Sequence, residues 1–124
     1  QAWRRPLFGA GVGSVGALTR RIWDGMEHPH NDYLRLGFEL GLVGLGLWLT
    51  VMGWQLLDLR RRLRGSRGAV RQALAASMLG LCVLLITAAT DNTLIYNLLF
   101  TNPLFALIGA AYGADGQYDP VDAS

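Results

Sequence analysis

Three long runs without a charged residue most constrain what this chain can fold into. The first run, Gly41 to Leu57, has 17 residues, and the second, Ala73 to Thr90, has 18. The third, Asn92 to Ala114, is interrupted by Pro103. Because an α-helix rises about 1.5 Å per residue, roughly 20 apolar residues cross a hydrocarbon core of about 30 Å. The runs therefore predict an all-α membrane protein with three transmembrane helices, which belong to a larger polytopic bundle.

Composition agrees with a membrane location and argues against other classes. Hydrophobic residues make up 52% of the chain, and the mean hydropathy is +0.28. The net charge is only +2 and no basic–aromatic pattern is found, so no nucleic-acid partner is expected. The single cysteine, Cys82, lies in an apolar run, which gives no disulfide framework. Because the chain starts at Gln1 within this pattern, we expect it to be the C-terminal part of a longer protein.

Arginine density predicts the orientation and the segment boundaries. Residues 60–71 carry six arginines between the first two runs, and short Arg-rich loops stay on the cytoplasmic side of a membrane. The expected segments are a Gly- and Arg-rich extracytoplasmic loop region with a short helix (1–31), a helix start and first transmembrane helix (32–59), a cytoplasmic Arg-rich loop (60–71), a second transmembrane helix (72–90), an extracytoplasmic turn with a Pro-interrupted third transmembrane helix (91–114), and a disordered acidic cytoplasmic tail (115–124).

Four arginines contradict this orientation, because they fall in the region expected to be extracytoplasmic. They are Arg4, Arg5, Arg20 and Arg21. Either the acidic residues of the same region balance them, or they bind an anionic ligand. Those acidic residues are Asp24, Glu27 and Asp32. Both interpretations stay open, and Arg20 and Arg21 are candidate substrate-binding residues.

Two local signals refine the expected helices. Small residues four positions apart, Ala73 with Ser77 and Ala76 with Gly80, let helices approach closely in lipid. Pro103 lacks a backbone N–H donor. We therefore expect either a kink or a short lead-in segment, followed by a helix from about residue 103.

The polar residues before the first span form the candidate site. Ionisable groups at membrane depth cost free energy, so they are read as functional by default. Asn31 is a candidate N-cap, so His30 precedes the first helical turn and can face a cavity as a catalytic base. Alternatively, His30 is an interfacial cap without chemistry. His28 and His30 have no third ligand, so no metal and no cofactor is expected.

Arg35 is the second candidate in this helix. It lies four residues after Asn31 and four before Glu39, so the three share one helix face. Asn31 and Arg35 are therefore candidate substrate-binding residues. A simple ion pair between Arg35 and Glu39 at the headgroup level is the competing interpretation.

Two weaker motifs lie outside this helix. Asp91 and Asn92 begin the third run on the same side as His30, and they either cap a helix or contact a hydroxylated acceptor. Residues 8–16, FGAGVGSVG, contain the pattern GxGxxG. No buried strand precedes it, as a dinucleotide fingerprint requires. This segment is either a flexible loop or a nest of backbone N–H groups for a phosphate.

The segments PLFGAGVGS and HPHNDYLRLGFELGLVG together resemble the C-terminal signature of the O-antigen ligase and polymerase family. The family pattern is His, then Asn, Ser or Gln, nine residues, Gly, two residues and Gly. His30, Asn31, Gly41 and Gly44 fit this spacing. The later DNTLIYNLLFTNPLFALIGAAYG is similar to the family's final segments, so the resemblance covers nearly the whole chain. The family also has an arginine further upstream of PLFG, which would lie before Gln1, so part of the expected site is not in this sequence.

The resemblance implies a membrane glycosyltransferase that moves a glycan from undecaprenyl diphosphate to a hydroxyl of a glycan, lipid A core or protein acceptor. It also implies a multi-pass protein of the bacterial inner membrane, with its site facing the periplasm or the cell exterior. In that reaction His30 accepts the hydroxyl proton, while Arg35, or Arg20 and Arg21, binds the diphosphate. The alternatives are a transporter or flippase subunit that binds the lipid-linked glycan without chemistry, and a purely structural membrane module.

Overall fold

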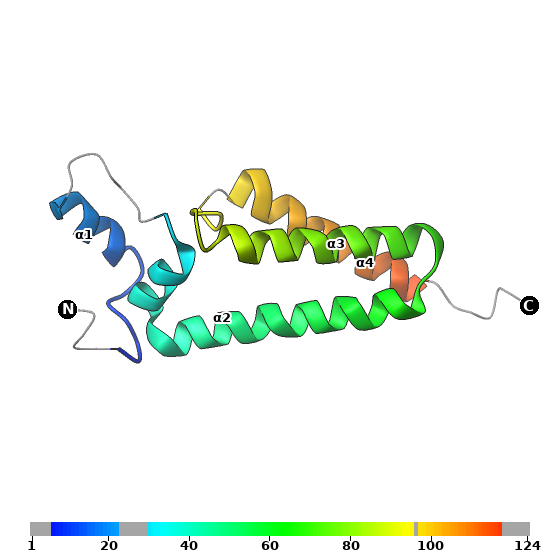
Figure 1. Ribbon diagram of the computed structural model, residues 1–124, viewed down its shortest axis with the longest axis horizontal. Coiled ribbons are helices and arrows are strands. Elements are labelled where there is room, and N and C mark those ends of the chain that lie inside the picture. The colour runs from blue at the N-terminus through cyan, green and yellow to red at the C-terminus, as the bar shows by residue number, and fades with distance from the viewer. Residues whose placement is uncertain (1–5, 23–29, 96, 118–124) are drawn as a thin grey trace, which may run out of the picture.

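The computed structural model describes residues 6–22, 30–95 and 97–117. Within these ranges the protein is all-helical. Its elements are α1 (Ser14–Ile22), α2 (Asp32–Gly65), α3 (Gly68–Thr87), the π-helical segment η2 (Asn97–Thr101) and α4 (Asn102–Gln117). α2 and α3 form an antiparallel hairpin, α4 packs on α3, and α1 contacts α2 far from the hairpin turn (Figure 1).

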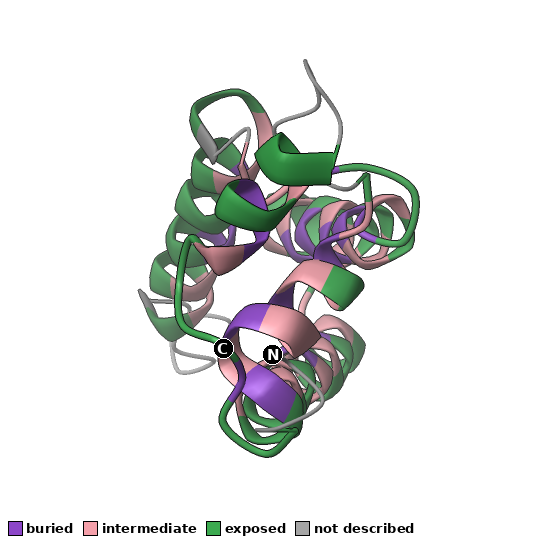
Figure 2. Cartoon of the chain, turned by 90° about the vertical axis from the view of Figure 1, so that its left-hand side faces the viewer, coloured by how far each residue is buried: buried purple, intermediate pink, exposed green. Residues whose placement is uncertain are grey.

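The three long helices share one small apolar core. Leu59 of α2, Leu81 of α3 and Ile108 of α4 are buried in it. Viewed along the long axis, exposed residues occupy the outer faces of the helices (Figure 2). A Cβ at Gly80 would lie 2.6 Å from Cδ1 of Leu104, so α4 approaches α3 closely at this small residue. This confirms the role predicted for a small residue at this position.

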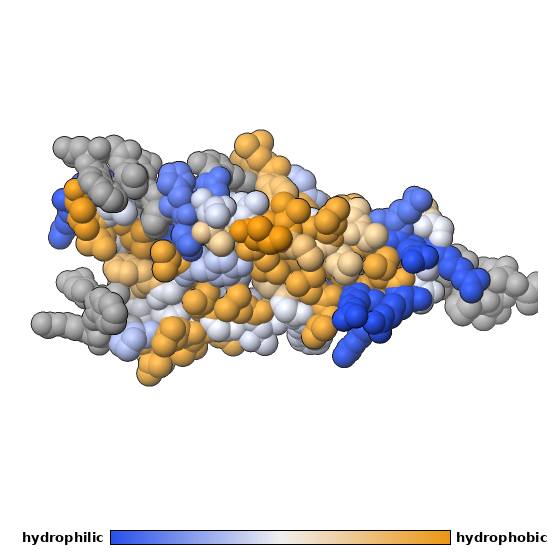
Figure 3. Space-filling model, viewed as in Figure 1, coloured by the Kyte–Doolittle hydropathy of each residue, from blue (hydrophilic) through white to orange (hydrophobic). Residues whose placement is uncertain are grey.

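Apolar side chains also cover the outer faces of the bundle. Exposed examples are Leu47 and Trp54 on α2 and Leu79 and Ile86 on α3. Both helices are long and apolar enough to cross a membrane, and only 11% and 22% of their most apolar stretches is buried. A helix in the core of a soluble protein is mostly buried, so this exposure favours a membrane environment. Figure 3 shows apolar side chains over the middle of the bundle and hydrophilic ones gathered at its Arg-rich end.

The helices run further at the Arg-rich end than the sequence predicts. We expected a loop over residues 60–71, but α2 continues to Gly65 and α3 begins at Gly68. Arginine is a good helix former. In addition, the Arg62 Nε donates to Oδ2 of Asp58, one turn earlier, at 2.8 Å. Only two residues therefore connect the two helices.

The prediction of a disordered tail over residues 115–124 is also wrong for residues 115–117. α4 extends to Gln117, and the Asp115 carboxylate is engaged by the hairpin turn. It accepts hydrogen bonds from Nη1 of Arg62 at 3.0 Å and from Oγ of Ser66 at 2.6 Å. These contacts give the end of α4 something to pack against. Residues 118–124 lie outside the described residues.

The remaining boundaries follow local hydrogen bonding. α4 begins at Asn102, next to Pro103, and η2 precedes it, which confirms the predicted lead-in segment. α3 ends at Thr87, three residues before the boundary predicted at residue 90. It ends there because the N–H groups of Thr90 and Asp91 both donate to the Thr87 carbonyl, at 2.9 and 2.8 Å, and turn the chain.

Candidate active site

A break at Gly41 divides α2 into a short segment, 32–40, and a long segment, 42–65. Gly41 has φ +72° and ψ −173°, a backbone conformation that favours glycine. The short segment turns away from the axis of the long one (Figure 1). This break is absent from the sequence prediction, which has one continuous helix here.

The segment 6–11, which we call the strap, binds the backbone groups that the break releases. Two strap N–H groups donate to carbonyls before the break, and two N–H groups after the break donate to strap carbonyls. The four bonds run from Ala10 to Phe38 (2.9 Å), from Gly11 to Glu39 (2.9 Å), from Leu42 to Pro6 (2.9 Å) and from Val43 to Leu7 (3.1 Å). Broken helices at membrane depth are tolerated only where such groups are satisfied within the protein.

Two glycines permit this close approach of backbones. A Cβ at Gly9 would overlap the Glu39 carbonyl, and a Cβ at Gly41 would overlap the Leu7 carbonyl. Gly9 also has a positive φ of +71°. The PLFG motif and the first glycine of the His–Asn–Gly–Gly pattern therefore meet in one backbone joint.

Glu39 connects this joint to α1. Its side chain is nearly buried, and its Oε1 accepts hydrogen bonds from the N–H groups of Gly13 at 2.9 Å and Val15 at 3.4 Å. The N-terminus of a helix favours a carboxylate. The sequence predicts either a flexible loop or a phosphate nest at GxGxxG. In the structure, these N–H groups bind a carboxylate of the chain itself.

Arg35 lies between two buried carboxylates. Its Nη1 is 3.5 Å from Oδ1 of Asp32, and its Nε is 3.9 Å from Oε2 of Glu39. Only 18% of the Arg35 side chain is exposed. The geometry fits the ion-pair interpretation, because the two carboxylates already compensate the guanidinium charge. A diphosphate at Arg35 has to compete with both of them.

Asn31 caps α2 as predicted, and it also fixes the turn that follows α3. Its Oδ1 accepts a hydrogen bond from the Leu34 N–H at 2.9 Å, which is the expected N-cap geometry. Its Nδ2 donates to the carbonyl of Ala89 at 2.8 Å. The side chain is therefore used twice within the protein, which argues for a positioning role.

Asp32 is the fully buried centre of this end of the protein. Its N–H donates to the Ala88 carbonyl at 2.8 Å. Its Oδ2 accepts hydrogen bonds from the Leu94 N–H at 2.8 Å and from Oγ1 of Thr93 at 3.2 Å. Together these bonds hold the chain on either side of Asp91 against the start of α2.

That arrangement brings His30 and Asp91 together at the surface. The His30 Nδ1 lies 3.4 Å from Oδ1 of Asp91, and the two side chains are 64% and 52% exposed. The Asn92 N–H donates to the same oxygen at 2.7 Å. This bond, followed by the contact with His30, lowers the pKa of Asp91. An imidazole whose Nδ1 faces a carboxylate is oriented to use its Nε2 as a proton acceptor. Among the described residues, no hydrogen bond occupies that Nε2.

The other predicted substrate-binding residues are placed differently. Asn92 adjoins Asp91 in the chain but is buried, and its Oδ1 has no hydrogen-bond partner among the described residues. Arg20 and Arg21 are exposed on α1, and the Arg20 Nε donates to the carbonyl of Gly16 in its own helix at 3.2 Å. Neither arginine forms an ion pair within the described part of the chain.

Some of the sequence interpretations fall on undescribed residues. These residues are Arg4, Arg5, Asp24, Glu27 and His28. Within the described ranges, no group of three His, Cys, Asp or Glu side chains is arranged to hold a metal ion.

Sequence reasoning did not identify Asp91 as the partner of His30. It proposed a cap or an acceptor contact instead, although it placed both residues on one side of the membrane. Comparisons with protein-family models, curated proteins and solved structures found no match to this chain. What the protein does must therefore be inferred from its own residues.

Proposed function

We propose that this chain carries the transfer site of a membrane glycosyltransferase of the O-antigen ligase or polymerase type. The observation that supports this most is the exposed pair of His30 and Asp91, joined at 3.4 Å across 61 positions of sequence. A second support is that the motifs on which the family resemblance rests, PLFG and Gly41, form one backbone joint.

The proposed step needs one base and one leaving group. The acceptor hydroxyl gives its proton to Nε2 of His30, and its oxygen forms a bond to the anomeric carbon of the donor sugar. The bond from that carbon to undecaprenyl diphosphate breaks, and the diphosphate leaves with the electron pair. Asp91 accepts a hydrogen bond from Nδ1–H, which fixes the tautomer and stabilises the imidazolium that forms.

The departing diphosphate requires cationic groups. Guanidinium groups suit it because their donors match two oxygens at once. Arg20 and Arg21 are proposed for this role since both are exposed on α1. Arg35 is proposed to contribute to diphosphate binding only with donors that Asp32 and Glu39 leave free. Asn31 and Asn92 are proposed to shape the site rather than bind substrate directly.

The proposed membrane arrangement has three spans. α2 and α3 supply the first two. The third consists of η2, with 5 residues, and α4, with 16, which follow each other directly and carry no charge before Asp115. The six arginines of residues 60–71 favour the cytoplasmic side for the hairpin turn, and the proposal adopts this orientation. His30 and Asp91 then face the periplasm or the cell exterior, where lipid-linked glycans are used.

The test is a transfer assay with the intact protein in detergent or nanodiscs. Undecaprenyl-diphosphate-linked glycan and a glycan acceptor are supplied, and both the product and the released undecaprenyl diphosphate are measured. We expect His30→Ala to lower the rate by about 10²–10⁴-fold. Thr90→Ala is the matched control, because Thr90 is exposed in the turn that carries Asp91 and its hydroxyl bonds only the Thr87 carbonyl among described residues.

Two results would contradict the proposal. An unchanged rate in a well-folded His30→Ala protein excludes the general-base role. Movement of the lipid-linked glycan between leaflets without release of undecaprenyl diphosphate assigns the protein to transport instead.

A further inference from the structure

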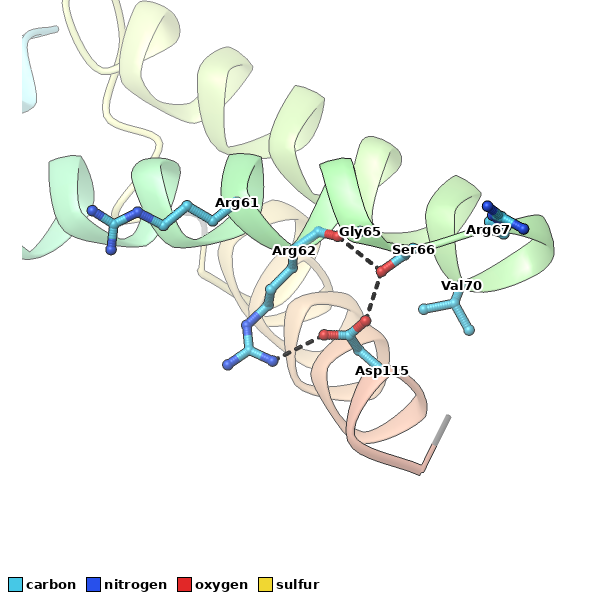
Figure 4. A pocket seen from close by; sticks show the side chains of 7 residues that line it. All are labelled: Arg61, Arg62, Gly65, Ser66, Arg67, Val70 and Asp115. Atoms are coloured by element: carbon cyan, nitrogen blue, oxygen red, sulfur yellow. Dashed lines mark hydrogen bonds and ion pairs between the residues drawn. The ribbon is translucent and has the colours of Figure 1, made fainter. Parts of the chain in front are cut away.

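The Arg-rich end of the bundle carries a pocket that the proposed transfer reaction does not use. It has a volume of about 290 Å³ and lies where α2, the hairpin turn, the start of α3 and the end of α4 meet. Three of its lining side chains are arginines, namely Arg61, Arg62 and Arg67 (Figure 4). Ser66 and Asp115 supply polar groups, and Val70 supplies an apolar one.

One side of this pocket is fixed by Arg62. Its Nε donates to Asp58 at 2.8 Å and its Nη1 to Asp115 at 3.0 Å. Its guanidinium carbon also lies 4.6 Å from the centre of the Tyr112 ring. Two carboxylates compensate the charge of Arg62. Arg62 therefore connects α2 to α4 and is not available to bind an anionic ligand.

Arg61 and Arg67 are the cations that remain available. Both are exposed, and neither forms an ion pair within the described residues. Arg67 is also the N-cap of α3, and no side chain caps that helix. The first N–H groups of α3 therefore add to the positive potential of the two guanidinium groups. An anion is favoured at this pocket on electrostatic grounds.

An apolar groove adjoins the pocket and shares Arg62 with it. The groove has a volume of about 560 Å³ and lies between α2 and α4. Val51, Trp54 and Phe105 supply its apolar walls, and Asp58 and Tyr112 lie at its polar end. In a chain with two potential membrane spans, a groove of this kind runs from the polar end of the helices toward lipid.

We propose that the pocket and the groove together bind one anionic phospholipid. The Arg61 and Arg67 side chains extend toward opposite sides of the pocket in Figure 4, and in the proposed complex both turn inward to bind the phosphate. One acyl chain follows the groove past Val51 and Phe105. Arginine donors match phosphate oxygens, and basic pockets between helices on the cytoplasmic side of a membrane bind anionic headgroups. The apolar groove calls for a chain that a free phosphate lacks. This site lies at the opposite end of α2 from His30 and does not depend on the proposed transfer reaction.

Native mass spectrometry of the intact protein in detergent tests this proposal. Phosphatidylglycerol or phosphatidylcholine is titrated, and the bound fraction is measured. We expect the wild-type protein to bind phosphatidylglycerol about tenfold more tightly or better. The double variant R61Q/R67Q should lose this preference. The matched control is R60Q/R64Q, which removes the same charge from exposed residues at the end of α2 that do not line the pocket.

Two further measurements identify the occupant. Val51→Trp narrows the groove and is expected to weaken phosphatidylglycerol binding several-fold while leaving the protein folded, since Val51 is 53% exposed. Glycerol 3-phosphate, which has the phosphate without acyl chains, should compete only at far higher concentration. The proposal is overturned if both double variants lose the preference equally, if glycerol 3-phosphate competes as well as the lipid, or if a second copy of the chain covers the groove in a stable dimer.

Discussion

The joint between the strap and α2 makes a strong prediction about Gly41→Ala. Gly41 has φ +72° and ψ −173°, a backbone region almost restricted to glycine, and an alanine there costs roughly 2 kcal/mol. The added Cβ would also overlap the Leu7 carbonyl, so the strap has to move away. Loss of two of its four hydrogen bonds, at about 1 kcal/mol each, adds roughly 2 kcal/mol. We therefore expect Gly41→Ala to lower the free energy of unfolding by about 3–4 kcal/mol.

Substitutions at two other glycines separate the cost of the backbone conformation from the cost of the lost strap contacts. Gly11 has φ +99° but open space around its Cβ position, so Gly11→Ala measures the backbone cost alone, about 1–2 kcal/mol. Gly46 is helical and also open, so Gly46→Ala should raise stability by about 0.5–1 kcal/mol. The three variants differ by the same methyl group and sit within the same two segments, the strap and α2.

The measurement is SDS-induced unfolding of the intact protein in mild detergent micelles, followed by tryptophan fluorescence. The expected order of stability is Gly46→Ala, wild type, Gly11→Ala and then Gly41→Ala. If Gly41→Ala is no less stable than Gly11→Ala, the strap does not pack against the break as described, and the reasoning about the joint fails.

Three further predictions concern the start of α2 and the turn that follows α3. Asp91→Asn removes the charge that orients His30, so we expect kcat for the proposed glycan transfer to fall by about 10-fold to 10²-fold, less than in His30→Ala. An unchanged kcat would exclude the pair from the proposed catalysis. The Asn92 N–H and then His30 lower the pKa of Asp91 in the folded protein, so this stabilisation is present above the ordinary carboxyl pKa and is lost on acidification. The difference in unfolding between wild type and Asp91→Asn should therefore shrink below about pH 4, and a pH-independent difference would contradict it. Asp32→Ala leaves Arg35 without one of its two carboxylates and should lower the free energy of unfolding in SDS by about 3 kcal/mol. Asp32→Asn should lower it less, and equal losses of stability in the two variants would argue against a charge effect.

Local sequence was sufficient for the features that depend on local chemistry. Charge-free runs predicted helices, Asn31 predicted a cap, and Pro103 predicted the start of α4 to within one residue. Helix ends at the Arg-rich end were misjudged for a different reason. Asp58 and Asp115 hold Arg62 from one turn before it and from another helix, and no pattern within residues 60–71 contains that information.

The break in α2 could not be predicted from the helix that contains it. GLVGLGL has the composition of a small-residue packing face, and such stretches are usually continuous in lipid. Only the strap, about 30 positions earlier in the chain, shows that Gly41 is left-handed. The pairing of His30 with Asp91 is non-local in the same sense, because Asn31 and Asp32 create it by binding the turn after α3.

The break and the His30–Asp91 pair are connected through the short segment of α2. At one end of that segment, Glu39 binds the N-terminus of α1 and its backbone carbonyl binds the strap. At the other end, Asp32 holds the backbone that carries Asp91. Arg35 lies between these two carboxylates and within 4 Å of each. A continuous helix would carry residues 30–40 along the axis of the long segment, away from the strap that binds Phe38 and Glu39. The broken helix is therefore what presents His30 and the turn after α3 to each other, and this gives Gly41 and His30 one common structural purpose.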